Sequence, residues 1–180
     1  MSDGFRVTSS VPLLHSYVFD VERVSVAHGG QAFERDVARH RGAVAILAIN
    51  DAGEIGVLRQ FRATMDRTTL EIPAGTCDVV GEDALATAQR ELREEMGCEA
   101  GTWRLLARLM VSPGWTDQLM LIYEARDLRE LDRRPEGPEE SAATTEWLSP
   151  ERLREVLAGE PAIDATMAAA LNRVYGTFFD

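Results

Sequence analysis

The stretch EDALATAQRELREEMGC, residues 82–98, decides the fold. From Asp83 to Met96 it holds neither proline nor glycine, and it is rich in alanine, leucine, glutamate and arginine, which have high helix propensity. Gly97 follows directly, and glycine is the commonest residue just past the end of a helix. We therefore predict a helix from Asp83 to Met96.

The predicted helix carries an apolar stripe with an acidic flank beside it. At about 100° per residue, four apolar side chains share one face that must point to the core: Leu85, Ala88, Leu92 and Met96. Glu91, Glu94 and Glu95 lie together beside this face, and like charges so close destabilise a helix. Hard divalent cations such as Mg²⁺ or Mn²⁺ prefer carboxylate oxygens, so the flank indicates a metal site; a solvated helix face is the alternative. Arg90 can reach Glu94 one turn later and orient the cluster.

Composition excludes several classes of function. The chain has 180 residues, of which 45% are hydrophobic and 27% charged, as expected for one globular domain. A net charge of −11 repels polyanions, so nucleic acid is not an expected partner. Two cysteines, Cys77 and Cys98, without a CxxC pattern argue against zinc or a disulfide framework. Without a long apolar run or a secretory pattern at the start, we expect no membrane contact and a cytoplasmic location.

The rest of the chain alternates strands with helices, which predicts a single α/β or α+β domain. Before the main helix we expect an N-terminal hairpin or strand pair, a central hairpin and a short strand: Ser16 to Val26 with Phe33 to Arg39, Ala43 to Ile49 with Ile55 to Arg62, and Leu70 to Ile72. After it we expect strands, a solvated connection and two capped helices: Trp103 to Val111, Leu119 to Ala125, Arg126 to Ser141, Thr145 to Leu148, Pro150 to Ala158 and Ala165 to Tyr175.

The helix belongs to a longer motif that resembles the Nudix box of the Nudix hydrolases. That box has a glycine, a glutamate and then REUxEExGU, where U is bulky and apolar, and here Gly75, Glu82 and the residues from Arg90 to Cys98 match it. Residues 76–81 make the first gap one residue longer than in the box, an extension found among ADP-ribose pyrophosphatase-like members. Blocks between Phe33 and Ala125 also look like those enzymes: Glu34-Arg35-Asp36, Arg59-Gln60-Phe61-Arg62, Glu71-Ile72-Pro73-Ala74-Gly75 and Ser112-Pro113-Gly114.

The resemblance implies a fold, an assembly and an activity. The fold is the Nudix α/β/α sandwich with a mixed β-sheet, in which residues 1–40 form an N-terminal β element and residues 41–180 the hydrolase domain. The assembly is a homodimer, often with exchanged N-terminal strands. The activity is Mg²⁺-dependent hydrolysis of a nucleoside diphosphate sugar, with ADP-ribose cut to AMP and ribose 5-phosphate; Mn²⁺ is an alternative ion.

Site residues also follow from the resemblance. Glu91, Glu95 and the carbonyl of Ala74 are implied as metal ligands, and Glu94 as a ligand or an acid that orients water. With Arg90, Glu94 is assigned to catalysis. Four further residues are assigned to the substrate, with Arg62 on its phosphate and Trp115 stacked on its base or ribose: Arg35, Arg62, Trp115 and Gln118. A surface arginine and an edge-of-core or dimer tryptophan are the alternatives for Arg62 and Trp115.

One position departs from the family pattern. Where similar members carry a glutamate as base or extra ligand, this chain has Gln118, and a neutral amide cannot accept a proton from water. Three interpretations remain: Asp117 substitutes, an acid between Glu136 and Glu140 reaches the site, or the chain is a weak or inactive catalyst. We favour Glu139 or Glu140, with a solvated acidic loop as the alternative. The rival functions are hydrolysis of another nucleotide sugar or dinucleotide, and a regulator that binds a nucleotide sugar without cutting it.

Overall fold

The computed structural model describes residues 4–179, which fall into two compact units. The first unit comprises the residues up to Gly42 together with Leu109–Leu119. The second comprises Ala43–Arg108 and the chain from Met120 onward.

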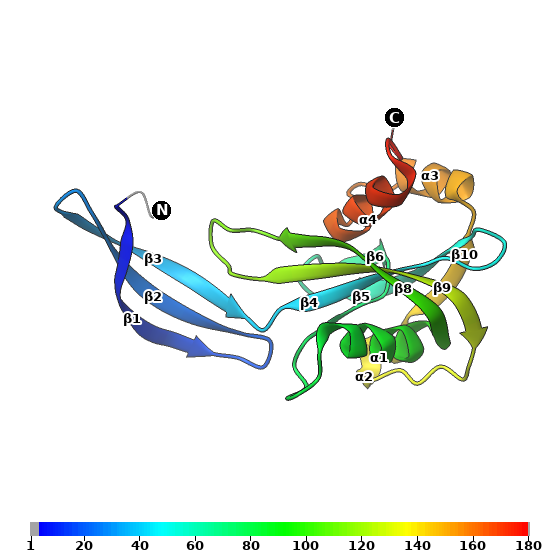
Figure 1. Ribbon diagram of the computed structural model, residues 1–180, viewed down its shortest axis with the longest axis horizontal. Coiled ribbons are helices and arrows are strands. Elements are labelled where there is room, and N and C mark those ends of the chain that lie inside the picture. The colour runs from blue at the N-terminus through cyan, green and yellow to red at the C-terminus, as the bar shows by residue number, and fades with distance from the viewer. Residues whose placement is uncertain (1–3, 180) are drawn as a thin grey trace. The chain divides into compact units, whose positions relative to one another are not determined.

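The first unit contains an antiparallel sheet of three strands, in the order β1 (Arg6–His15), β2 (Phe19–His28) and β3 (Gln31–His40) (Figure 1). The predicted strand pair corresponds to β2 and β3, although β2 begins at Phe19 and not at Ser16. The sequence prediction omitted β1. Its residues are all exposed, so no buried face imposes an apolar alternation, and its pairing with β2 is irregular beside Pro12, which has no N–H to donate.

The second unit contains a mixed four-stranded sheet, in the order β7 (Ala74–Thr76), β4 (Ala43–Ala48), β9 (Leu119–Glu130) and β8 (Cys98–Met110). Strand β4 runs antiparallel to β7 and parallel to β9, so the expected mixed sheet is confirmed. All six residues of β4 are buried, as expected for a strand with both faces covered.

A second sheet in the same unit has the order β10 (Thr144–Leu148), β5 (Ile55–Arg62) and β6 (Arg67–Glu71). The predicted central hairpin is therefore wrong, because β4 and β5 belong to different sheets and an isolated bridge between Ile49 and Ile55 joins them. The turn chemistry was correct: the Asn50 side chain accepts hydrogen bonds from the N–H groups of Ala52 and Glu54. A turn reverses the chain but does not determine which strands pair. Strand β4 pairs with β7 on one edge and with β9 on the other, so β5 cannot pair along it.

The two long strands of the mixed sheet extend beyond their predicted limits. Strand β8 begins at Cys98 and not at Trp103, and β9 continues to Glu130 and not Ala125. The predicted connection from Arg126 to Ser141 is correspondingly shorter and includes a short helix, α2 (Gly137–Ala142). The missed end of β9 is mostly charged, with Arg126, Asp127, Arg129 and Glu130, and such residues are less common in strands.

The helices flank the sheets of the second unit, with α1 (Ala84–Met96) and α2 on one side and α3 (Pro150–Ala158) and α4 (Ala165–Tyr175) on the other (Figure 1). The expected α/β/α arrangement is confirmed. The predicted starts of α3 and α4 are correct, and the side chains of Ser149 and Asp164 cap them by accepting backbone hydrogen bonds. Helix α1 begins at Ala84, one residue later than predicted, because Asp83 is its N-cap. In residues 4–179, none of the helices has the length and apolar character needed to cross a membrane.

Helix α1 joins the core through its predicted apolar stripe. Ala88, Leu92 and Met96 are buried, and Leu85 packs against the same cluster. The cluster includes alternate residues of β4 and two residues of β9: Val44, Ile46, Ala48, Tyr123 and Ala125. Gly97 ends the helix with a φ of 64°, the left-handed conformation that glycine adopts without strain. The acidic flank is thereby held at a defined position beside β7.

Candidate functional site

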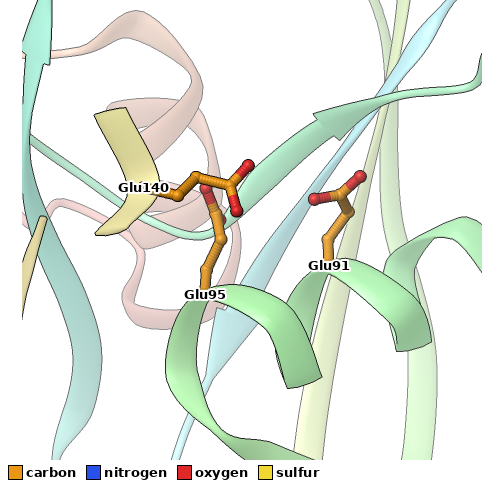
Figure 2. Close-up of side chains that lie close together, drawn as sticks. All are labelled: Glu91, Glu95 and Glu140. Carbon is orange, nitrogen blue, oxygen red and sulfur yellow. The ribbon is translucent and has the colours of Figure 1, made fainter. Parts of the chain in front are cut away.

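Three carboxylates from two helices converge in the second unit. Glu91 and Glu95 come from α1 and Glu140 from α2, and one oxygen of each lies within 4.8 Å of the others (Figure 2). Glu91 and Glu95 are only 5% and 2% exposed. Glu139 and Glu140 were the two acids predicted to reach the site. The structure places Glu140 in the cluster, whereas Glu139 is exposed to solvent.

Strand β7 supplies the wall against which these carboxylates rest. The N–H of Ala74 donates a hydrogen bond of 2.9 Å to Oε2 of Glu95. At Gly75, a Cβ atom would lie 2.0 Å from both Cδ and Oε1 of Glu91, far inside van der Waals contact. Only glycine leaves room for the carboxylate of Glu91 at this position, which gives the first glycine of the motif a steric role.

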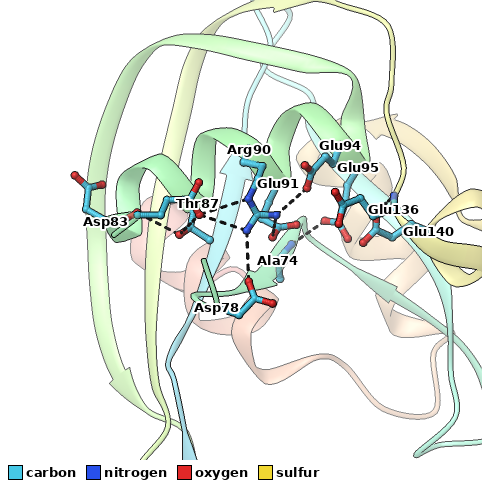
Figure 3. Close-up of polar contacts among 11 residues, drawn as sticks. Ala74, Asp78, Asp83, Thr87, Arg90, Glu91, Glu94, Glu95, Glu136 and Glu140 are labelled. Carbon is cyan, nitrogen blue, oxygen red and sulfur yellow. Dashed lines mark hydrogen bonds and ion pairs between the residues drawn. The ribbon is translucent and has the colours of Figure 1, made fainter. Parts of the chain in front are cut away.

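Arg90 is the cationic centre of the acidic flank (Figure 3). Its Nη1 lies 2.7 Å from Oε1 of Glu91 and 2.9 Å from Oε2 of Glu94, so the predicted contact one turn along the helix is present. On the other side, its Nε lies 3.4 Å from Oε2 of Glu82. The guanidinium thus holds the side chains of Glu91 and Glu94 in place while partly neutralising them.

Sequence reasoning missed two residues that complete this network. The buried hydroxyl of Thr87 donates a hydrogen bond of 2.9 Å to Oε2 of Glu82, the same oxygen that faces Arg90. Oδ1 of Asp78 lies 3.9 Å from Nη2 of Arg90. A polar residue on the inner side of an amphipathic helix was a usable signal for Thr87, whereas Asp78 reaches the site from a loop that has no periodicity.

Burial makes the cluster difficult to ionise without a cation. It raises the pKa of Glu91 to about 7, with Arg90 opposing the shift, and that of Glu95 to about 8, with the Ala74 N–H opposing it. Burial also raises the pKa of Glu94. The negative charge of Glu140 adds to all three increases. Crowded carboxylates of this kind fit a hard divalent ion, which favours oxygen ligands and compensates their charge.

Two other predicted ligands lie at the edge of the cluster. The carboxylate of Glu94 pairs with Arg90 and does not belong to the group of three oxygens described above. Ala74 is in contact with the cluster through its N–H. The predicted ligand roles of Glu94 and of the Ala74 carbonyl remain predictions.

Arg62 forms a fork-shaped pair with Glu71 in the same unit, with Nε–Oε1 and Nη2–Oε2 distances of 2.9 and 2.6 Å. Burial alone would raise the pKa of Glu71, but the hydrogen bonds from Arg62 and Thr69 hold that pKa below its usual value. The hydrogen bond to Glu71 raises the pKa of Arg62, and the charges of Glu95 and Glu139 add to this increase. The Arg62 guanidinium is thus paired with Glu71, and its contact with a substrate phosphate remains a prediction.

The other predicted substrate residues belong to the first unit. The guanidinium of Arg35 lies 4.5 Å from the centre of the Phe33 ring, and the Trp115 side chain is 58% exposed. The backbone N–H of Gln118 donates to the hydroxyl of Thr116. Their predicted contacts with substrate remain predictions.

Asp117, the alternative acid, already has partners within the first unit. Its Oδ2 lies 3.2 Å from Nη1 of Arg39, and its Oδ1 accepts a hydrogen bond of 2.9 Å from the N–H of His40. Each carboxylate oxygen therefore has one donor and keeps a second lone pair, so these bonds do not distinguish Asp117 from Glu140, whose Oε2 also accepts a hydrogen bond. Glu140 is favoured because its carboxylate belongs to the acidic cluster.

Comparisons with known proteins agree with the motif. The NUDIX domain family matches residues 39–171, a range that includes both helices of the cluster. An "ADP-ribose pyrophosphatase" of Mycobacterium tuberculosis is 40% identical over 169 residues, which cover 93% of this chain and 82% of that protein. One of Bacillus subtilis is 34% identical over 156 residues, covering 87% and 82%. The crystal structure of an "ADP compounds hydrolase" matches with a TM-score of 0.82 over 96% of this chain and 92% of that one, at 23% identity.

Proposed function

This chain belongs to the Nudix domain family and is a Nudix hydrolase; from that premise we propose that it hydrolyses the diphosphate bond of ADP-ribose, giving AMP and ribose 5-phosphate. Two relatives that align with most of the chain bear the name ADP-ribose pyrophosphatase, which supports this substrate. We further propose that the reaction needs Mg²⁺, for which Mn²⁺ can substitute.

The observation that carries the proposal is the convergence of Glu91, Glu95 and Glu140 within 4.8 Å. Two of these carboxylates are buried, and of the two, Arg90 pairs only with Glu91; because burying uncompensated charge is costly, a bound cation would stabilise the arrangement. Glu91, Glu95 and Glu140 would hold the ion, with Glu94 and the Ala74 carbonyl as further ligands. A divalent ion bound there would neutralise the diphosphate and would lower the pKa of a bound water.

The protein's own side chains orient the reaction. Arg90 keeps Glu91 and Glu94 in fixed positions, and Arg62 provides a cation for a substrate phosphate. Glu140 supplies a carboxylate that can accept the proton of the attacking water, which the amide of Gln118 cannot do. Glu139 remains the second choice for this acid. Arg35, Trp115 and Gln118 complete the proposed contacts with substrate.

We also propose a homodimer and a cytoplasmic location, with residues 1–40 as an N-terminal β element and residues 41–180 as the hydrolase domain. Support for the dimer comes from β1, which leaves large apolar side chains exposed: Val7, Val11, Leu13 and Leu14. Residues 1–3 of that element and residue 180 lie outside the described residues. Light scattering of the purified protein tests the dimer, and a monomer would contradict it.

The activity is tested by assaying ADP-ribose with and without Mg²⁺ and identifying both products. We expect metal-dependent release of AMP and ribose 5-phosphate, and a loss of about 10²-fold or more in the variant Glu95→Gln, as when one group that stabilises the transition state is removed. Glu99→Gln is the matched control, because Glu99 is exposed and pairs with Arg129. Equal turnover in the Glu95→Gln variant would remove the cluster from the mechanism.

A second candidate is hydrolysis of other ADP compounds. A relative from Escherichia coli, "ADP compounds hydrolase NudE", is 31% identical over 116 residues, covering 63% of this chain and 61% of that protein, and its name favours a wider substrate range. A panel of nucleotide sugars and dinucleotides separates the two candidates by kcat/KM. Tight binding of a nucleotide sugar without turnover of any compound would instead favour the regulator.

A further inference from the structure

Helix α2 is poorly suited to hold an acid in place by itself. It has six residues, which are exposed apart from half-buried Glu140. In the described chain, its N-cap residue, Glu136, makes no capping hydrogen bond through its side chain. A helix this short is marginal in water, because nucleation is unfavourable and little apolar surface is removed from water. Contacts outside α2 must therefore keep Glu140 beside Glu91 and Glu95.

Arg133 provides two such contacts. Its Nη2 donates a hydrogen bond of 2.7 Å to the carbonyl of Glu140, and its Nη1 donates one of 2.9 Å to the carbonyl of Ala143. Both carbonyls lie at the carboxyl-terminal end of α2, and that of Glu140 also accepts a hydrogen bond of 3.1 Å from the N–H of Ala143. The Nε of Arg133 is buried without a hydrogen-bond partner among residues 4–179, so this guanidinium has given up solvent to reach the helix.

The backbone that carries Arg133 is itself fixed to the end of α1. The N–H of Leu131 donates a hydrogen bond of 2.7 Å to the carbonyl of Gly97. A Cβ on Gly97 would lie 2.8 Å from the Leu131 carbonyl oxygen and 3.1 Å from the N of Arg133, so the two segments touch without a side chain between them. Gly97 therefore ends α1 and also provides the surface on which residues 131–133 rest.

Glu140 receives a second restraint from its own helix. Its Oε2 accepts a hydrogen bond of 2.6 Å from the N–H of Glu136. This bond orients the side chain relative to α2, whereas the bonds from Arg133 orient α2 relative to the end of α1. The two restraints together direct the carboxylate to the cluster.

We propose that Arg133 is a positioning residue: by holding the carbonyls of Glu140 and Ala143, it fixes α2 against the end of α1 and keeps the Glu140 carboxylate beside Glu91 and Glu95. Its effect on turnover rests on the proposed function, because it acts through Glu140. Its effect on α2 is independent of that function and can be measured in the metal-free protein.

The test is hydrogen–deuterium exchange of residues 134–146 in metal-free protein, combined with steady-state kinetics in Mg²⁺. In the Arg133→Met variant we expect faster exchange of the α2 amides by about tenfold or more, because the opening free energy of the segment falls. We expect kcat to fall by about tenfold with KM within about twofold, as when substrate binding is kept and transition-state stabilisation is lost. Arg133→Lys, which can reach one carbonyl, should give intermediate values of both.

Arg134→Met is the matched control, since Arg134 is the exposed neighbour and makes no hydrogen bond or ion pair among residues 4–179 within the usual distance limits. It should leave both exchange and kcat unchanged. Unchanged hydrogen–deuterium exchange of α2 in Arg133→Met would overturn the proposal. If Glu140→Gln lowers kcat, faster exchange with an unchanged kcat in Arg133→Met would also overturn it.

A double variant separates this proposal from the proposed function. If Arg133 acts through Glu140, adding Arg133→Met to Glu140→Gln should lower kcat by less than about twofold further, because coupled residues are not additive. A full additional tenfold loss would overturn the route through Glu140. If Glu140→Gln alone has wild-type turnover, the proposed role of Glu140 fails, while the exchange data still decide whether Arg133 holds α2.

Discussion

Helices α1 and α2 both deliver glutamates to one acidic cluster, but they are built in different ways. Helix α1 has 13 residues, a side-chain N-cap at Asp83, a left-handed C-cap at Gly97 and a buried apolar stripe. Helix α2 has six residues, is mostly exposed and is held at its end by Arg133. The comparison teaches that a rigid element can carry ligands as part of the core, whereas an acid on a surface helix needs contacts from elsewhere in the chain.

The largest expected effect comes from the acid on α2. Glu140→Gln should lower kcat by about 10²–10⁴-fold with little change in KM, the usual contribution of a general base. Glu139→Gln should stay within about twofold of wild type, since Glu139 is exposed and lies outside the cluster. Steady-state kinetics with ADP-ribose compares the two variants, and an equal loss in both would remove the distinction between these neighbours.

The next effect concerns the wall beside α1. Gly75→Ala should lower kcat/KM by about 10–10²-fold, because the new Cβ displaces the Glu91 carboxylate and small errors in position are costly to catalysis. Gly114→Ala is the control, since a Cβ there meets nothing within 4 Å. Wild-type activity in Gly75→Ala would mean that Glu91 can adopt another productive position.

The stability of the metal-free protein should reveal the cost of burying acids on α1. The pKa of Glu95 is raised from 4.5 to about 8 in the folded protein, so the folded state binds the proton more tightly than the unfolded state. Protonated Glu95 therefore stabilises the fold fully below the pKa of the unfolded state, 4.5, and this contribution is lost as the pH rises through about 8. Glu95→Gln should therefore increase the free energy of unfolding at pH 8 by about 4 kcal/mol, and change it little at pH 4. Urea denaturation in a chelating buffer measures this difference.

At pH 8 in saturating Mg²⁺, the wild type should be more stable to urea than Glu95→Gln, because the ion binds the folded wild type and stabilises it by linkage. Glu99→Gln, which alters an exposed carboxylate, should show neither effect. A Glu95→Gln variant that is less stable than wild type in metal-free buffer at pH 8 would mean that the cluster is already compensated within the protein.

The smallest effect should come from the cap of α1. Asp83→Ala removes the hydrogen bond of 2.9 Å to the N–H of Ala86 and should lower the free energy of unfolding by about 1 kcal/mol, the usual value for an N-cap. Turnover should stay within about twofold of wild type, because the buried stripe keeps α1 in place. A large loss of turnover at unchanged stability would show that the start of α1 matters to the site directly.

Predictions from the sequence succeeded where local rules govern the chain. The limits of α1, α3 and α4 followed from composition, caps and periodicity to within one residue, and Ser149 and Asp164 accept the hydrogen bonds of N-caps. They failed for the central hairpin and for β1. In each case the missing information was the partner: the neighbours of β4 come from distant segments, and β1 has no buried face to mark its alternation.

For the candidate site, helix periodicity was enough to predict that Glu91, Glu94 and Glu95 share one flank of a helix, since residues three and four apart lie side by side. Only the tertiary structure decided that Glu140, and not Glu139, completes the cluster, and that Gly75 makes room for Glu91. The physical reason is the range of the interactions. Helical geometry repeats within a few residues, whereas the position of α2 depends on Arg133 and Gly97, which meet only when the chain has folded.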